Sequence, residues 1–204
     1  MGVCDNLLKQ DIVPSCDDPA IPGFEQEGVL INRKDIDFAN VTFNVTRSNV
    51  MEALPLKQGK KGFKIVALGA QPFNGTGTAF AAGTYRNSFN NTFAFVVLDD
   101  GPDVRGNIID ALANGEFVAV LENKYKGMGK TNKGDCAFQV YGFYQGLKAT
   151  EMADGKYSED TDGGWTITMQ ETKTPKSGLY LFKTSYDATQ KLVETLLTVA
   201  GGIR

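Results

Sequence analysis

The stretch TFAFVVLDDGPDVRGNIIDALANGEFVAVLENKYKGMGKTNKGDCAFQVYGFYQGL, residues 92–147, decides how this chain folds. It predicts, in order, a strand, a short amphipathic helix, a buried strand at 117–121, a glycine- and lysine-rich loop, and a strand at 136–144. Aromatic-rich strands around one short helix are typical of a domain built on a sheet. Nothing in the stretch indicates catalysis, so it favours a structural protein over an enzyme.

The helix within this stretch has clear boundary signals. Residues 101–103, Gly-Pro-Asp, put a proline and an acidic group in the first turn, where both are favourable. Apolar residues then recur with helical spacing and predict one buried stripe: Val104, Ile108, Ala111 and Leu112. Asn114-Gly115 should end the helix, with the glycine in the left-handed conformation.

The segments before this stretch predict strands and loops. Residues 1–28 contain three prolines and predict an irregular arm, and a strand followed by a turn begins at Gly28. Alternation over 41–45 predicts a half-buried strand, and KIVAL at 64–68 predicts a short apolar one. Residues 71–92 are rich in glycine, asparagine and threonine, and we expect a long surface loop there.

The C-terminal third predicts a hairpin and a helix. Trp165, Ile167 and Met169 alternate with polar residues as in a one-sided strand, and 179–182 is expected to pair with it across a turn. Asp187 and Gln190 resemble a capping box. The apolar face of the helix that follows comprises Leu192, Val193, Leu196, Leu197 and Ala200. This face packs either on the chain's own sheet or on a neighbouring subunit.

Together these patterns predict a β-rich α+β fold with about seven or eight strands and one inserted helix. We divide the chain into an N-terminal arm at 1–28, a single β-rich domain at 29–184, and a C-terminal helix and tail at 185–204.

Composition bounds the function. The chain has 204 residues and a net charge of −3, which argues against a basic face that grips nucleic acid. It contains no histidine, the commonest general base and transition-metal ligand. Cys4, Cys16 and Cys136 have no CxxC spacing and predict reduced thiols. We therefore expect no catalytic residues, no metal and no cofactor.

We also expect no secretory signal and no membrane span, because the longest apolar run, 117–121, is far shorter than the roughly 18 residues that a span requires.

Three motifs resemble functional sites only in part. Residues 127–131, GMGKT, end like a phosphate-binding loop, but Lys124 stands where the first glycine belongs and a strand follows instead of a helix. Residues 160–163 resemble a calcium loop whose first and last ligand positions are wrong. Asp99 and Asp100 are adjacent on a strand end and should point apart, so a helix entry explains them better than a catalytic pair.

Several stretches carry a resemblance to a known family. They are CDN at 4–6 with GVLINRKDID at 28–37, IIDALANGEFVAVLENKYKG at 108–127, and VYGFYQGLKAT at 140–150 with DGGWTITMQETKTP at 162–175. Over residues 28–182 the chain resembles the tail-tube and neck-ring proteins of bacteriophages, particularly phages of Bacteroidota, including the crAss-like group. In those proteins a helix precedes a buried strand that ends in a Glu-Asn pair, here Glu122-Asn123, and a strand like 141–147 follows.

The resemblance implies a β-sandwich flanked by one helix, in a virion structural protein without a catalytic site. It implies homo-oligomeric rings whose sheets join edge to edge around a channel for DNA ejection. The partners would be further copies of the chain, neighbouring tail, neck or portal proteins, and genomic DNA that passes without specific binding; no membrane is involved. The segment at 71–92 and both chain ends would be the contacts between rings.

Two other classes remain as alternatives. A monomeric carbohydrate-binding β-sandwich of a receptor-binding appendage would need an aromatic platform, for which Trp165, Tyr85 and Tyr144 are the candidates. A carboxylate-dependent glycosidase would need two acidic residues facing across a cleft, and no segment predicts such a pair.

Overall fold

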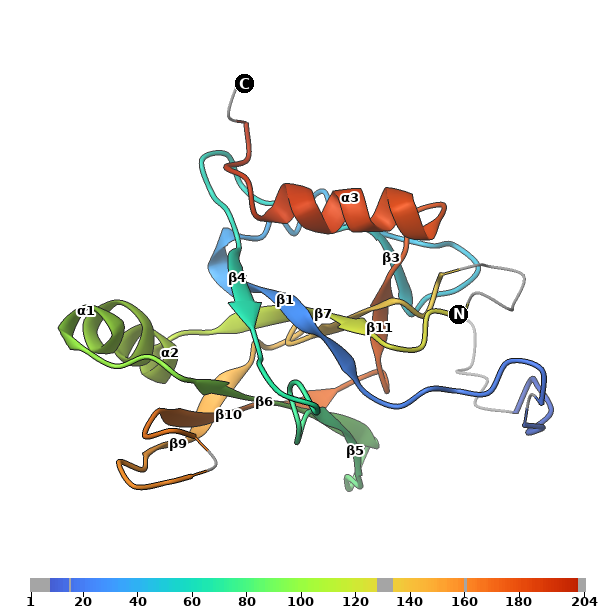
Figure 1. Ribbon diagram of the computed structural model, residues 1–204. Helices are drawn as coiled ribbons and strands as arrows, with labels where there is room; N and C mark the ends of the chain where they lie inside the picture. The colour runs from blue at the N-terminus through green and yellow to red at the C-terminus, as the bar shows by residue number, and fades with distance from the viewer. Residues whose placement is uncertain (1–7, 15, 128–133, 160, 202–204) are drawn as a thin grey trace.

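Two β-sheets and a C-terminal helix form three layers in a computed structural model that describes residues 8–14, 16–127, 134–159 and 161–201 (Figure 1). The seven-stranded sheet has the order β2 (Thr42–Phe43), β3 (Val50–Ala53), β11 (Leu179–Leu181), β8 (Phe138–Tyr141), β7 (Phe117–Asn123), β1 (Phe24–Asn32), β4 (Phe63–Val66). The four-stranded sheet has the order β5 (Gly77–Ala81), β6 (Ser88–Val97), β10 (Trp165–Thr174), β9 (Lys148–Asp154). The helical segments are η1 (Arg33–Asp35), α1 (Pro102–Val104), η2 (Arg105–Ile109), α2 (Asp110–Asn114) and α3 (Tyr186–Leu196). The β-rich α+β class and the two packed sheets are confirmed.

The seven-stranded sheet lies in the middle and is apolar on both faces. Strand β7 shows why, since successive side chains of a strand point to opposite faces. Val118 and Val120 belong to the core beneath α3, whereas Ala119 and Leu121 belong to the core against the four-stranded sheet. The uninterrupted apolar run at 117–121 is therefore a strand buried on both sides, as predicted.

The predicted surface loop at 71–92 is wrong. It contains β5 and the start of β6, which pair as an antiparallel hairpin from Gly77↔Thr92 to Ala81↔Ser88. Strand β9 was also missed, because its sequence KATEMAD carries little β-propensity. Both strands form through pairing with a long neighbour, so tertiary context overrides local composition.

The expected pairing of 179–182 with the strand at 165–170 is wrong as well. Strand β10 ends in a bulge at Lys173, whose φ is 57°, and the chain crosses to the other sheet. There β11 pairs antiparallel to β8 and parallel to β3. The connection from β10 to β11 thus links the two sheets instead of closing a hairpin.

Two smaller boundaries also differ. The strand predicted at 41–45 shrinks to β2, and Val45 is fully exposed, because the Asn44 side chain accepts hydrogen bonds from the backbone N–H groups of Thr46 and Arg47. The first strand also starts earlier than predicted: β1 begins at Phe24, which pairs with Asn123 of β7. The arm is therefore shorter than the predicted 1–28.

The helix after β6 contains a π-helical turn, and this changes which side chains are buried. In η2 the hydrogen bonds span one extra residue, so the position after Ile108 turns inward. Ile109 and Leu112 are buried, whereas Ile108 is 43% exposed and Ala111 is exposed. The prediction for Leu112 is confirmed, and that for Ile108 is wrong.

Glycine ends this helix for a reason other than the expected one. Gly115 is extended, with φ −94° and ψ 172°, not left-handed. A Cβ at this position would lie 2.4 Å from Cζ of Phe117, so close packing requires the glycine. The helix turns straight into β7 with the Phe117 ring against it.

Helix α3 packs on its own seven-stranded sheet, which decides between the two alternatives for its apolar face. Leu196 is 4% exposed, and Leu192, Val193 and Leu197 pack partly buried against the same core. Its N-cap is Ser185, whose hydroxyl accepts from the backbone N–H of Ala188. The predicted capping box of Asp187 and Gln190 is thus displaced by a cap two residues earlier.

Candidate assembly surface

The four-stranded sheet has two free edges. Among the described strands, β5 pairs only with β6 and β9 pairs only with β10. An edge strand presents unpaired backbone N–H and C=O groups, which folded proteins usually shield with charges, prolines or bulges. Strand β5, with the sequence GTAFA, has none of these. Its outer edge is therefore chemically open to a further strand.

The two edges run in opposite directions. Each neighbouring pair in the order β5-β6-β10-β9 is antiparallel, so β5 runs with β10 and against β9. When one copy is rotated about an axis along the strands, its β5 meets β9 of the preceding copy in an antiparallel arrangement. This is a head-to-tail contact, which closes into a ring if the rotation closes.

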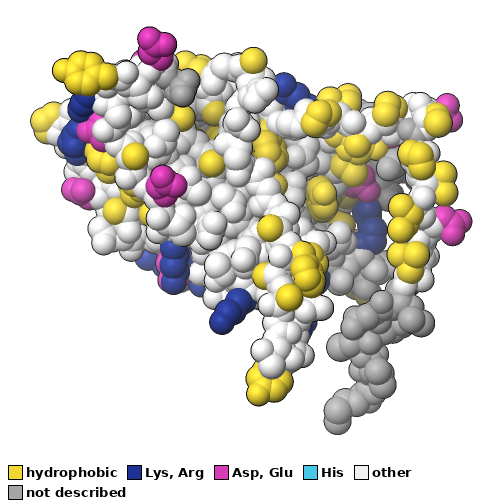
Figure 2. All heavy atoms as spheres, turned by 90° about the horizontal axis from the view of Figure 1, so that it is seen from below, with side chains coloured by type: hydrophobic (Ala, Val, Ile, Leu, Met, Phe, Trp, Pro, Cys, Tyr) yellow, Lys and Arg dark blue, Asp and Glu magenta, His cyan; other side chains and the backbone are white. Residues whose placement is uncertain are grey.

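The outer face of this sheet carries mostly small side chains, and the charged residues that the pairing places on it, Lys148 and Glu151, lie on the edge strand β9. The inner face of the sheet is apolar, with Phe93, Phe95, Ile167 and Met169 buried against the seven-stranded sheet. The register places the alternate residues outside, among them Ala79, Thr92, Ala94, Val96, Thr166, Thr168 and Gln170. Figure 2 views the molecule from this side and shows a broad area with few charged side chains. The cation that register places on this face, Lys148, is paired with Glu116 at 2.9 Å.

A buried carboxylate fixes this sheet against the other one. Glu171 of β10 is 1% exposed. Its oxygens accept from the backbone N–H groups of Gly142 at 3.0 Å and Gln145 at 2.7 Å, which follow β8, and from the side-chain amide of Asn91 at 3.0 Å. A buried charge is tolerated only when such donors surround it. Glu171 therefore sets the spacing of the two sheets where β8 ends.

A network of charges holds the helix to the β9–β10 hairpin at the other end of the sheet. Arg105 donates to Asp100 at 2.8 Å and to Asp154 at 2.7 Å, and its guanidinium lies 5.1 Å from the ring centre of Trp165. Lys156 pairs with the same two carboxylates. Hydrogen bonds from Arg105 and then Lys156 hold the pKa of Asp100 well below its ordinary range, and Arg105 does the same for the pKa of Asp154. At the helix entry, Asp99 Oδ1 accepts from the backbone N–H of Asp100, and Asp100 Oδ1 accepts from that of Gly101.

The three aromatic candidates for a carbohydrate platform lie apart. Trp165 begins β10 opposite Val97, whereas Tyr85 lies in the β5–β6 turn beyond the other end of the same strands. About nine residues of strand separate these ends, or roughly 30 Å. Tyr144 follows β8 and packs edge-to-face on Phe143, 5.5 Å away. No common aromatic surface results from these three side chains.

The remaining motifs give no site within the described chain. Most of 127–131, together with Asp160 and Cys4, lies outside the described residues, and Asp162 lies in a tight turn with φ 48°. Cys16 is exposed, and the Sγ of Cys136 donates a hydrogen bond to Asp135 Oδ1 at 3.4 Å. Among the residues that the structure describes, no group of three or more histidine, cysteine or carboxylate side chains could hold a metal ion. Within the same residues, no helix has the length and apolarity to cross a membrane.

The open edges could not be predicted from the sequence. A strand is an edge only when no other strand pairs with its second side, and local sequence does not show which strands pair. The buried Glu171 left a signal: it continues the alternation of Trp165, Ile167 and Met169 and so occupies an inward position. Comparison of the chain with protein-family models, curated proteins and solved structures finds no match.

Proposed function

We propose that this chain is a virion structural protein that forms a homo-oligomeric ring in a phage tail or neck and lines the channel for DNA ejection. The observation that carries the proposal is the pair of free, oppositely directed edges on the four-stranded sheet. Pairing β9 of one copy with β5 of the next would satisfy both edges and continue an antiparallel sheet around the ring. The sequence resemblance to tail-tube and neck-ring proteins supports the same arrangement.

The outer face of that sheet suits a channel wall. Proteins that hold duplex DNA do so with lysine and arginine side chains that neutralise phosphates. Thr92, Ala94, Thr166 and Thr168 offer neither, and the chain as a whole carries a net charge of −3. DNA would slide past such a wall without being retained.

A disulfide across the junction tests the ring. In a background with the native cysteines replaced by serine, Ala79→Cys on β5 is combined with Glu151→Cys or Ala153→Cys on β9. Three strand spacings separate β5 from β9 within one copy, about 14 Å, which exceeds the ~7 Å that a disulfide can bridge. A bond between these positions must therefore join two copies. We expect a ladder of cross-linked species that ends at the closed ring.

The single-cysteine variants are the matched controls and should give nothing larger than a dimer. Absence of a ladder from both double variants, together with dispersed single chains in negative-stain images, would refute edge pairing. Mass spectrometry of purified phage particles tests the virion location separately, and absence of the chain from them would refute it.

A further inference from the structure

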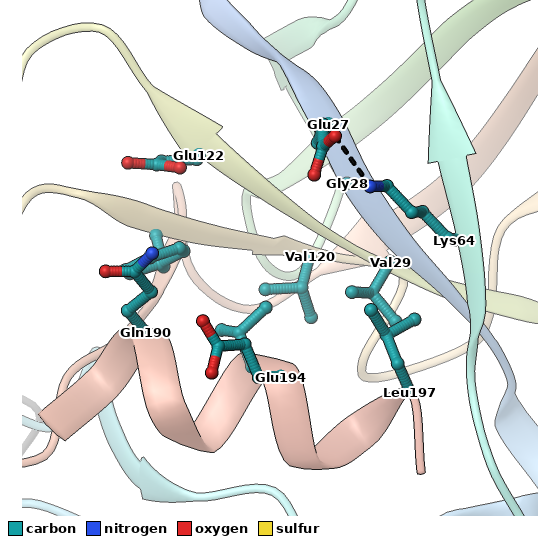
Figure 3. A pocket seen from close by; sticks show the side chains of 11 residues that line it. Glu27, Gly28, Val29, Lys64, Val120, Glu122, Gln190, Glu194 and Leu197 are labelled. Carbon is teal, nitrogen blue, oxygen red and sulfur yellow. Dashed lines mark ion pairs between the residues drawn. The ribbon is translucent and has the colours of Figure 1, made fainter. Parts of the chain in front are cut away.

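A narrow groove lies between α3 and the seven-stranded sheet, with a volume of about 120 Å³ (Figure 3). Its apolar floor comprises Val29, Val120, Phe138, Val193 and Leu197. Gln190 and Glu194 reach into it from α3, and Glu27 and Glu122 border it from β1 and β7. A long aliphatic stem with a cationic end would match this combination of floor and rim.

The carboxylates of the rim are not equally compensated. Glu27 pairs with Lys64 at 2.6 Å, and Glu122 with Lys126 at 2.6 Å. Glu194 is exposed, and its carboxylate has no ion pair or hydrogen bond with any described residue. The groove therefore keeps one unmatched negative charge beside an apolar floor.

The complementary group lies at the tip of the β5–β6 hairpin. Arg86 is exposed there and, unlike the other described arginines, makes no hydrogen bond or ion pair with the described residues. The tip has a defined shape: the backbone N–H of Gly83 donates to Asn87 Oδ1, and a Cβ on Gly83 would lie 2.3 Å from the carbonyl oxygen of Arg86. A turn that already has a defined shape loses less entropy on docking than a flexible one.

The groove and the tip belong to opposite layers. Figure 1 shows α3 on one side of the seven-stranded sheet and β5 on the other. A hairpin of one copy thus cannot fill its own groove but is placed to fill that of another. We propose that the groove receives the hairpin tip of a second copy, with Arg86 forming a fork of hydrogen bonds to Glu194. This contact rests on the proposed self-assembly and adds a second junction to the edge pairing.

A charge swap between the two positions tests the contact. Arg86→Glu sets like charges against Glu194, and Glu194→Arg sets them against Arg86. Each variant alone should raise the protein concentration at which assembly begins at least about tenfold in sedimentation velocity. When the two are mixed, the tip of each variant finds a groove of opposite charge on the other variant, so copies that alternate should assemble near the wild-type concentration. Lys34→Glu, at an exposed lysine of η1 that does not line the groove, gives the same charge change as Arg86→Glu and should have no effect.

Recovery on mixing cannot come from damaged folding, since neither variant changes the other's stability. If both variants assemble as the wild type does, or if mixing restores nothing, the contact is refuted while the β5–β9 cross-link ladder still stands. If the wild type does not assemble and the double-cysteine variants give no ladder, the ring and the contact fail together.

Discussion

Replacing Ile109 by alanine should destabilise the protein far more than the same change at its neighbour Ile108. The π-helical turn η2 directs Ile109 into the core between the sheets, where it is 5% exposed, and leaves Ile108 43% exposed. A regular α-helix would favour the opposite outcome, because Ile108 lies four residues after Val104. The two substitutions remove the same atoms from adjacent positions, so each controls for the other.

The expected magnitudes follow from burial. Truncating a fully buried isoleucine to alanine costs about 2–5 kcal/mol, and Ile109 fills a site between Leu112 and the sheet core, so we expect about 3 kcal/mol. Ile108 keeps nearly half of its surface in water, and alanine gains a few tenths of a kcal/mol in helix propensity. The net cost there should stay below about 1 kcal/mol.

Urea unfolding followed by circular dichroism and by the fluorescence of Trp165 measures both free energies of unfolding. The slopes with denaturant should match the wild type, so that midpoints report stability alone. Equal losses of stability for the two variants, or a larger loss for Ile108→Ala, would show that the helix has a regular α-helical register without the π-helical turn.

Two further predictions concern the polar groups. Glu171→Ala should lower the free energy of unfolding in urea by about 3 kcal/mol or more, because three donors lose a buried acceptor. Glu171→Gln keeps the side-chain volume and one acceptor oxygen, so it should cost less. Equal losses for the two variants would argue against the hydrogen bonds as the cause. The pKa of Asp100 is lowered by Arg105, so its stabilising effect is present above the ordinary carboxyl pKa of about 3.9 and is lost as pH falls through the lower folded value. Trp165 fluorescence should therefore stay constant from about pH 8 to about pH 5 and change only below about pH 4, and a transition near neutral pH would contradict this.

The elements that were predictable are those whose pattern is local. The apolar run at 117–121 and the alternation at Trp165, Ile167 and Met169 each specify a buried strand without reference to a partner. The π-helical turn could not be predicted, because Ile108 and Ile109 are both apolar and the sequence is compatible with either register. The core selects Ile109 through space that only the folded sheets create.

The parts of the candidate surface come from pairing between distant segments. Strands β5 and β9 have weak local signals and exist because β6 and β10 pair with them. The groove forms only where α3, β1 and β7 come together, so no single segment predicts it. The proposed contact between Arg86 and Glu194 depends on the position of both residues in the fold and could not be predicted from the sequence either. Composition anticipated one property of the surface, its low density of positive charge.

Strand β7 has a thermodynamic consequence for the whole molecule. Both of its faces are apolar, so removing either covering layer would expose apolar side chains to water. Loss of α3 would expose Val118 and Val120, and loss of the four-stranded sheet would expose Ala119 and Leu121. Each departure weakens the strand on which the other layer rests. The helix and the outer sheet, on opposite sides of the molecule, therefore share one melting transition through a strand between them.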